Sequence, residues 1–338
     1  MNITRIGIDL AKQVFQIHGV DRHGKVVARK QLRRSQMLAY FEKLPPTLIG
    51  MEACGSSHYW ARELGKMGHD ARLMSPQFVK PYVKSGKNDA NDAEAICEAV
   101  SRPNMRFVRV KSVEQQVMQA EHRIRARLIK ARTALSNEIR GLLGEFGIVL
   151  PVGLSNLRRA IPELLEDAEN GLLSEFRRLL RLLGEELTQL DDSIKKYDAR
   201  LAQCAKEDER IKRLLAVEGI GPVVASALVS AVGDGKQFSK GRDMAAWLGL
   251  TPNQHSSGGK SRLGHISKRG DKYVRTLLIH GARAALRAAE NKTDVRSRWV
   301  TGLAKRRNKN IATVALANKN ARIAWSILSR EETYRVAE

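Results

Sequence analysis

Hydrophobic and polar residues alternate in short runs over the first hundred positions of the chain. Runs of this kind, separated by turn residues, are typical of strands, and they predict three successive antiparallel strands at 3–10, 14–20 and 25–32. Farther along, the pattern predicts helices at 36–43, 58–67 and 89–100 and strands at 47–51 and 71–74. A three-stranded meander followed by β-α alternation predicts a mixed sheet that is covered by helices.

The middle of the chain changes to a helical period. Apolar residues recur every three or four positions over 113–146 and again over 174–205, which predicts two long amphipathic helices. Their two apolar stripes become buried either in an intramolecular helical hairpin or in a coiled-coil arm that dimerises. The periodicity of a single chain fits both alternatives equally.

From about residue 211 the pattern is mostly helical, with one interruption rich in Gly and Ser at 253–264. We interpret this interruption as a polar loop, and a loop of that length inside a helical domain is typically functional. The whole pattern predicts an α/β part followed by all-α parts, divided at 1–110, 111–205, 206–310 and a helical tail at 311–338.

The longest apolar run, 223–232, is about half of the roughly 20 residues that cross a bilayer, and the first residues lack a signal-peptide layout. Cys54, Cys97 and Cys204 lie far apart without a C-x-x-C pair, so neither a disulfide framework nor a zinc ribbon is expected. We expect a cytoplasmic protein that associates with the nucleoid and has no membrane partner.

Positive charge is concentrated in one segment. The 338 residues contain 59 Lys and Arg against 36 Asp and Glu, a net charge of +23, and residues 255–309 alone contain 15 basic residues against 3 acidic ones, or +12. A surface that only confers solubility normally mixes acids with its bases. A cluster of one sign instead indicates a nucleic-acid partner.

Four carboxylates have suggestive positions. Asp9 ends the first predicted strand, Glu52 follows the fourth, and Asp89 and Asp92 lie three residues apart at the start of a predicted helix. Ionised acids that cluster at strand ends repel one another unless a cation lies between them, and oxygen ligands without His or Cys select Mg²⁺ or Mn²⁺. Alternatively, Asp89 caps the helix and Asp92 completes the cap from the third helical position, although capping explains neither Asp9 nor Glu52.

Two further segments suggest contacts with phosphate. Gly219-Ile220-Gly221-Pro222 joins two predicted helices tightly and leaves backbone N–H groups that suit a phosphate oxygen, as in helix-hairpin-helix motifs, although other helix corners also use two glycines. In the predicted loop, Ser256 and Ser257 precede two glycines and are followed by several Lys and Arg. Such a serine either acts as a phosphodiester nucleophile or only donates a hydrogen bond to phosphate.

The ordered combination of these motifs resembles the insertion sequence 110 family of transposases, the Piv/MooV-type DEDD recombinases, and the doubled Ser-Ser-Gly-Gly is similar to the 1111 subgroup. The resemblance implies an RNase H-like (RuvC-like) N-terminal domain, a coiled-coil insertion and a mostly helical C-terminal transposase domain. It also implies that the protein recombines DNA with a structured bridge RNA as guide, and that it assembles as a dimer or tetramer.

For the site, the resemblance implies that Asp9, Glu52, Asp89 and Asp92 bind Mg²⁺ (or Mn²⁺) and that Ser257 is the nucleophile, with Ser256 as the alternative. One departure is Asn88, where many relatives have Thr. The residues that we expect at nucleic acid are Gly219, Gly221, Lys260, Arg262, Lys268, Arg269, Lys272 and Arg275.

Two other functions fit parts of the same pattern. The four carboxylates alone fit a two-metal nuclease of the Holliday-junction-resolvase kind, which uses water as its nucleophile and leaves no protein–DNA adduct. A basic nucleic-acid-binding protein with structural acids is the non-enzymatic alternative. The chain contains only 7 Phe, 4 Trp and 6 Tyr, so we expect phosphate contacts to dominate recognition.

Overall fold

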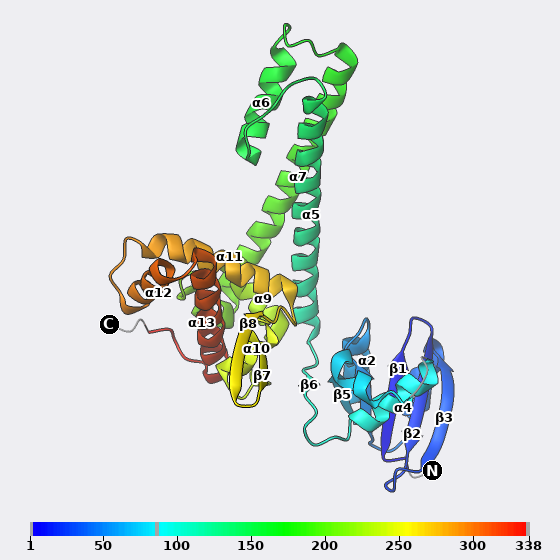
Figure 1. Cartoon of the computed structure of the whole chain (residues 1–338). Coiled ribbons are helices and arrows are strands. Elements are labelled where there is room, and N and C mark those ends of the chain that lie inside the picture. The colour runs from blue at the N-terminus through cyan, green and yellow to red at the C-terminus, as the bar shows by residue number, and fades with distance from the viewer. Residues whose placement is uncertain (1–2, 85–87, 336–338) are drawn as a thin grey trace. The chain divides into compact units, whose positions relative to one another are not determined.

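A computed structural model describes residues 3–84 and 88–335 of the chain (Figure 1). The chain forms two compact units, residues 1–113 and residues 114–338. The first is a mixed α/β unit, and the described residues of the second are helical except for one β-hairpin. No helix among the described residues has the length and apolarity that a membrane span requires.

The first unit contains a six-stranded sheet in the order β3-β2-β1-β4-β5-β6. Strands β1 (Arg5–Leu10), β2 (Val14–Val20) and β3 (Val26–Arg33) form an antiparallel meander. β4 (Leu48–Glu52) and β5 (Asp70–Met74) continue the sheet parallel to β1, and the short β6 (Phe107–Val108) pairs antiparallel with β5. The predicted meander and both later strands are confirmed. β6 was not predicted because two residues are too few to show alternation.

Helices accompany this sheet and bury its apolar side chains. They are η1 (Arg34–Gln36), α1 (Met37–Phe41), α2 (Ser57–Lys66), α3 (Pro76–Val79), η2 (Lys80–Tyr82) and α4 (Asp89–Ala99). α4 lies against β1, β2 and β4. Ile6 and Ile8 of β1, Phe15 of β2 and Ile49 of β4 are fully buried in the core of this unit.

Two glycines allow α4 to approach the sheet closely. Gly7 of β1 and Gly50 of β4 are register partners. A Cβ atom at Gly7 would lie 2.8 Å from the Cα atom of Cys97, and one at Gly50 would lie 2.7 Å from the Cβ atom of Val100. The pair therefore forms a shallow trough in which the C-terminal half of α4 rests, because any larger side chain would displace the helix.

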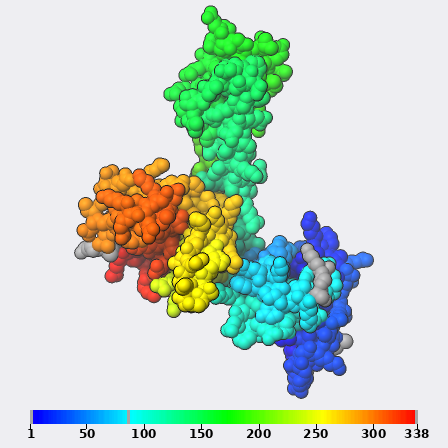
Figure 2. Space-filling view, in the orientation of Figure 1, coloured from blue at the N-terminus to red at the C-terminus, as the bar shows by residue number. Residues whose placement is uncertain are grey.

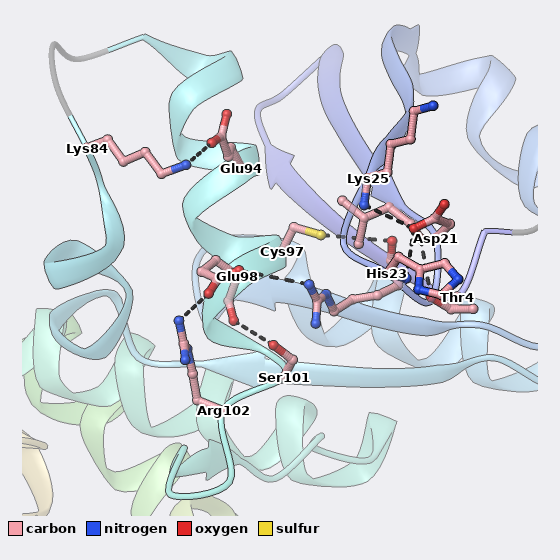
Figure 3. A network of polar contacts seen from close by, with 12 residues as sticks. Thr4, Asp21, His23, Lys25, Lys84, Glu94, Cys97, Glu98, Ser101 and Arg102 are labelled. Atoms are coloured by element: carbon pink, nitrogen blue, oxygen red, sulfur yellow. Dashed lines mark hydrogen bonds and ion pairs between the residues drawn. The ribbon is translucent and has the colours of Figure 1, made fainter.

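Polar contacts also anchor α4 (Figure 3). The Cys97 thiol donates to the carbonyl oxygen of Arg5 at 3.9 Å, and the Arg5 guanidinium forms an ion pair with Glu98 at 3.9 Å. At the middle of the helix, Lys84 Nζ lies 2.6 Å from a Glu94 carboxylate oxygen. Together with the glycine trough, these contacts fix the helix whose first turn carries Asp89 and Asp92.

The second unit begins with a helical arm. Helices α5 (Val113–Gly144) and α7 (Ser174–Glu207) are antiparallel, as the ion pairs Arg125–Asp198 (2.6 Å) and Arg132–Asp191 (2.9 Å) show. Both long helices were predicted, and within this chain they pack against each other as an intramolecular pair (Figure 1). Dimerisation of the arm stays a prediction.

A third helix of the arm, α6 (Leu154–Glu166), is absent from the sequence prediction, because Pro151 and Pro162 lie in or next to this segment and proline normally interrupts a helix. Pro162 lies inside α6, where it removes one backbone hydrogen bond. The helix persists because Leu157 and Ile161 are buried against α5 and α7.

The remaining helices form the largest core of the molecule. They are α8 (Glu209–Leu215), α9 (Pro222–Val232), α10 (Gly241–Trp247), α11 (Lys272–Ala289), α12 (Val295–Arg306) and α13 (Lys309–Arg330). Between α10 and α11 the chain forms a hairpin of β7 (Pro252–Ser257) and β8 (Lys260–Ile266). The interpretation of 253–264 as a loop is therefore wrong. Most of its side chains are polar and Leu263 is 68% exposed, so no apolar alternation marks the two strands.

The base of the arm is joined to this core by buried polar contacts. His122 of α5 lies 3.1 Å from the hydroxyl of Ser226 in α9 and 3.1 Å from the hydroxyl of Tyr273 in α11. Ser226 donates its own proton to the carbonyl oxygen of Pro222 at 2.6 Å, so it accepts from His122 Nε2, and Nδ1 accepts from Tyr273. This tautomer satisfies both ring nitrogens and ties α5 to α9 and α11.

Candidate active site

Asp9 and Glu52 lie near the ends of neighbouring strands. β1 and β4 are parallel, and their register pairs Ile8 with Met51, so the next residues, Asp9 and Glu52, lie at the same edge of the sheet. Both side chains are half-buried. The sequence places these acids at strand ends, and the parallel pairing brings the two strand ends together.

The first turn of α4 carries the other two carboxylates. Asn88 is the N-cap of this helix, and its Oδ1 accepts a hydrogen bond from the backbone N–H of Asn91 at 2.8 Å. Asp89 is thus the first helical residue, and the alternative in which Asp89 caps the helix is wrong. Because Asn88 makes the capping bond, Asp89 and Asp92 have no capping role and share one helical face. Thr, which also caps helices, would serve the same purpose at position 88.

Three of the four predicted carboxylates meet. Asp9, Asp89 and Asp92 each offer an oxygen atom, and these atoms lie within 4.8 Å of one another. Glu52 is not part of this triplet, although it is close enough for the charges of Asp9 and Asp92 to raise its pKa. The arrangement supplies oxygen ligands alone, which is the donor set that hard divalent cations prefer.

The electrostatics of the cluster also favour a cation. Burial, with added repulsion from Asp89 and Asp92, raises the pKa of Asp9 from 3.8 to about 6. Burial and the charges of Asp9 and Asp92 likewise raise the pKa of Glu52. A bound divalent cation would offset this repulsion and restore the ionised forms, so these residues fit a metal.

The glycines that let α4 reach Asp9 are functional residues that the sequence reasoning missed. Gly7 lies two residues before Asp9 and Gly50 two residues before Glu52, each inside an otherwise apolar strand. A glycine inside a strand pattern signals a close backbone approach. That signal was present in the sequence of both strands.

Ser257 is the last residue of β7, at the turn of the hairpin. It pairs with Lys260 of β8, and the two residues between them, Gly258 and Gly259, have φ angles of 56° and 76°. Two central residues with positive φ define a two-residue turn of the I′ type, which suits the twist of the strands. Glycine adopts this conformation without strain, so the turn presents Ser257 at the exposed tip of the hairpin.

The two serines differ in their partners. Ser256 Oγ accepts a hydrogen bond from Gln254 Nε2 at 2.8 Å and lies opposite Ser261. Successive side chains of a strand point to opposite faces, so Ser257 faces away from Ser256. Within the part of the chain that the structure describes, no hydrogen bond is recorded for the Ser257 hydroxyl. Of the two hydroxyls, that of Ser257 is therefore the more available for chemistry.

Five of the predicted phosphate-binding side chains are exposed on and after the hairpin, namely Lys260, Arg262, Lys268, Arg269 and Lys272. Arg275 differs from them, because it is 7% exposed and its Nη1 atom donates to the carbonyl oxygens of Leu248 and Arg269, each at 3.0 Å. In this position Arg275 holds the segment that follows the hairpin, and its guanidinium faces carbonyl groups of the protein.

The two predicted glycines of the α8–α9 connection also differ in their surroundings. Gly219 has a φ of 84°, and a Cβ atom there would lie 2.8 Å from the carbonyl oxygen of Gly281 in α11. Gly221 is exposed, has open space around its Cα atom and precedes the first turn of α9. Gly219 thus permits helix packing, whereas Gly221 leaves the start of α9 accessible.

Comparison with known proteins places this chain among transposases. Residues 6–148 match the family model of a DEDD transposase of the IS110 type, and residues 211–297 match the transposase family IS116/IS110/IS902. The chain is 58% identical to a probable family 20 transposase of Pseudomonas aeruginosa, with 99% of both chains covered. It is 48% identical to the transposase for insertion sequence element IS1111A of Coxiella burnetii, over 99% of this chain and 92% of the relative. It is 42% identical to the transposase for element IS1328 of Yersinia enterocolitica, over 97% of this chain and 98% of the relative.

Proposed function

Because the chain belongs to the IS116/IS110/IS902 family and is a transposase of an insertion sequence, we propose that it cuts and rejoins DNA through a transient bond between the DNA and Ser257. One observation carries this proposal. The hairpin turn exposes a serine hydroxyl without a partner in the described structure, beside a run of cationic side chains.

The first unit is proposed to be the RuvC-like metal-binding domain. Asp9, Asp89 and Asp92, with Glu52 at the neighbouring strand end, would hold Mg²⁺ or Mn²⁺. When bound, such an ion polarises the scissile phosphate and stabilises the charge that develops on it. The protein's own contribution is to hold the carboxylates together through the glycine trough and the Asn88 cap.

The second unit is proposed to supply the nucleophile. Ser257 Oγ forms a bond to phosphorus as the bond between phosphorus and the sugar oxygen breaks, so one phosphodiester bond replaces another. The hydroxyl proton passes to water, and the departing sugar oxygen takes up a proton from water. Attack by a sugar hydroxyl on the phosphoserine reverses these changes and rejoins the strands.

Cations next to Ser257 are proposed to neutralise the transition state. Lys260 lies directly opposite Ser257 in the hairpin, and Arg262 lies two residues farther along the same strand, on the same face as Lys260. Lys268, Arg269 and Lys272 extend this positive surface after the hairpin. Gly221 and the start of α9, in the manner of a helix-hairpin-helix, are proposed to contact the DNA backbone without reading its sequence.

A structured RNA of the element is proposed to guide the protein, because the family that it resembles uses such a bridge RNA. The net charge of +23 and the scarcity of aromatic residues support a protein that binds backbones and leaves sequence reading to base pairing. We also propose that the protein acts as a dimer or tetramer. Leu179 and Leu182 of α7 are 48% and 52% exposed and offer an apolar contact for a second copy.

Trapping of the covalent intermediate tests the nucleophile. A labelled DNA that carries the element junction is incubated with the protein, its RNA and Mg²⁺, and the mixture is separated on a denaturing gel. We expect a protein–DNA adduct for the native protein and for Ser256→Ala, and none for Ser257→Ala. DNA binding should be equal in all three, because loss of one hydroxyl removes little binding energy.

The same gel distinguishes the alternatives. An adduct that persists in Ser257→Ala but disappears in Ser256→Ala would assign the nucleophile to Ser256. Cleavage with free 5′-phosphate ends and no adduct would instead indicate a metal-dependent nuclease that uses water. Cleavage that survives Asp9→Asn and Glu52→Gln together would contradict the metal assignment.

A further inference from the structure

A groove runs along the exposed face of α13. Its volume is about 1500 Å³, and its floor is formed by Ile311, Val314 and Ala315 of that helix. The opposite wall comes from the start of α10 and from the base of the β7–β8 hairpin, where Pro252 and Ile266 face it. In Figure 2 the hairpin surface (yellow) protrudes beside the surface of α13 (red). The groove therefore begins where the hairpin that carries Ser257 leaves the core.

Cationic side chains line this apolar groove. They are Lys240, Arg242, Lys268, Lys319 and Arg322, and no Asp or Glu is among the described residues that line it. Ile311 on its floor is 53% exposed, so its apolar side chain is accessible to a ligand in the groove. An apolar surface bounded by charges of one sign is complementary to a ligand that is flat and apolar in one part and anionic in another.

Two tryptophans, Trp299 and Trp325, line the groove. The Trp299 side chain is 36% exposed, and Lys319 Nζ lies 4.5 Å from the centre of its ring. Trp325 donates its indole N–H to the carbonyl oxygen of Phe238 at 3.1 Å, so its polar atom is satisfied within the protein. A tryptophan ring beside a lysine is a combination that holds a nucleobase and its phosphate together.

We propose that this groove binds unpaired nucleotides of the DNA strand that Ser257 attacks, with their bases on Trp299 and the α13 floor and their phosphates on the surrounding Lys and Arg. This inference rests on the proposed function, because the assignment to DNA follows from the hairpin that forms one wall. An acidic amphipathic helix of a partner protein would also match the apolar floor and the positive charge. The stacking surfaces and the continuity with the hairpin favour the nucleotide.

Oligonucleotides without bases test the proposal. The affinity of the protein is measured by fluorescence anisotropy for a labelled thymidine oligonucleotide of about 15 nucleotides and for one of equal length with abasic sites at its centre. We expect the native protein to prefer the oligonucleotide with bases by about tenfold, because the abasic oligonucleotide cannot stack on the Trp299 ring. Trp299→Leu should abolish the preference. Arg322→Gln should weaken binding of both oligonucleotides by the same factor.

Control variants separate stacking from folding. Tyr59→Leu removes an aromatic ring that is 39% exposed in the first unit and should keep the preference. Ile311→Asp places a carboxylate on the exposed floor and should weaken binding of both oligonucleotides. Unchanged melting temperatures would show that these variants are folded. Ser257→Ala should keep the preference, so a missing covalent adduct and a missing base preference are separate failures.

Several outcomes would overturn the inference. Equal affinity of the native protein for the two oligonucleotides would exclude base stacking. A preference that survives in Trp299→Leu would mean that the bases stack at another place on the protein. Tighter binding of a single-stranded RNA of the same length than of the DNA oligonucleotide would assign the groove to the guide RNA. A loss of oligomeric mass in Ile311→Asp, with the base preference intact, would identify the groove as an interface between protein copies.

Discussion

Gly7 determines how closely α4 approaches the edge of the sheet that bears Asp9. We expect Gly7→Ala to destabilise the protein by about 1–3 kcal/mol, because the new methyl group would collide with the backbone of Ala93 and Cys97. The displaced helix would also separate Asp92 from Asp9 and weaken Mn²⁺ binding. Thermal unfolding and isothermal titration with Mn²⁺ measure the two effects.

Gly65→Ala is the matched control for this prediction. Gly65 lies in α2, with open space around its Cα atom and without a positive φ. Alanine favours a helix over glycine by up to about 1 kcal/mol, so this variant should be as stable as the native protein or more so, with unchanged Mn²⁺ affinity. Native stability in Gly7→Ala would mean that α4 does not depend on the trough.

His122 makes the second unit sensitive to acid. Burial, with repulsion from Arg125, lowers the pKa of His122 from 6.5 to about 4, and Asp271 offsets this only in part. Below pH 6.5 the unfolded chain takes up a proton at this histidine, whereas the folded protein does so only near pH 4. The neutral ring therefore contributes fully to the free energy of unfolding above pH 6.5. As the pH falls toward 4 this contribution is lost, and the free energy of unfolding decreases by up to about 3 kcal/mol.

Melting temperatures at pH 7 and pH 5 measure this dependence. His122→Gln should melt lower than the native protein at pH 7, because it loses a buried hydrogen bond, and the difference should shrink at pH 5. His58, whose pKa burial also lowers to about 4, is present in both proteins, so its contribution cancels. A difference that grows at pH 5 would contradict the assignment of the neutral tautomer.

At the scale of elements, the hairpin turn positions Ser257. Gly258→Val should abolish adduct formation, because a β-branched residue at a φ of 56° is strongly disfavoured and the turn would rearrange. Gly258→Asn should keep the activity, since Asn-Gly is a preferred sequence for a type I′ turn. Both variants are assayed for the covalent adduct and for DNA affinity, and equal adduct yields would show that the turn does not position the serine.

The sequence pattern predicts some of the helices and strands and misses others. The meander, the long helices and both acidic strand ends were predictable, because alternation and helical periodicity directly reflect which face is buried. The hairpin was not, since its residues are exposed on both faces and leave no periodic signal. α6 was missed because Pro162 is a local break signal that tertiary burial of Leu157 and Ile161 overrides.

The candidate site was predictable only in part for a related reason. Residue types and strand ends indicated the carboxylates, but their convergence depends on the parallel register of β1 with β4 and on the glycine trough, which involve residues distant in sequence. Arg275 illustrates the converse. Its place in a basic segment predicted a phosphate contact, whereas the fold directs its guanidinium to two carbonyl oxygens.

At the scale of the whole molecule, a net charge of +23 predicts that binding of nucleic acid weakens steeply with salt. If about six to ten phosphates are contacted, affinity should fall by about 10³ to 10⁵ between 50 and 200 mM salt. Lys260→Gln and Lys268→Gln should each reduce the slope of log affinity against log salt by about 1. Lys66→Gln is the control, because Lys66 forms an ion pair with Glu63 at 2.8 Å in the first unit and should leave the slope unchanged. An affinity that is flat over this range would mean that contacts other than ion pairs with phosphate dominate. The half of the charge excess that lies in residues 255–309 would then not be explained by phosphate binding.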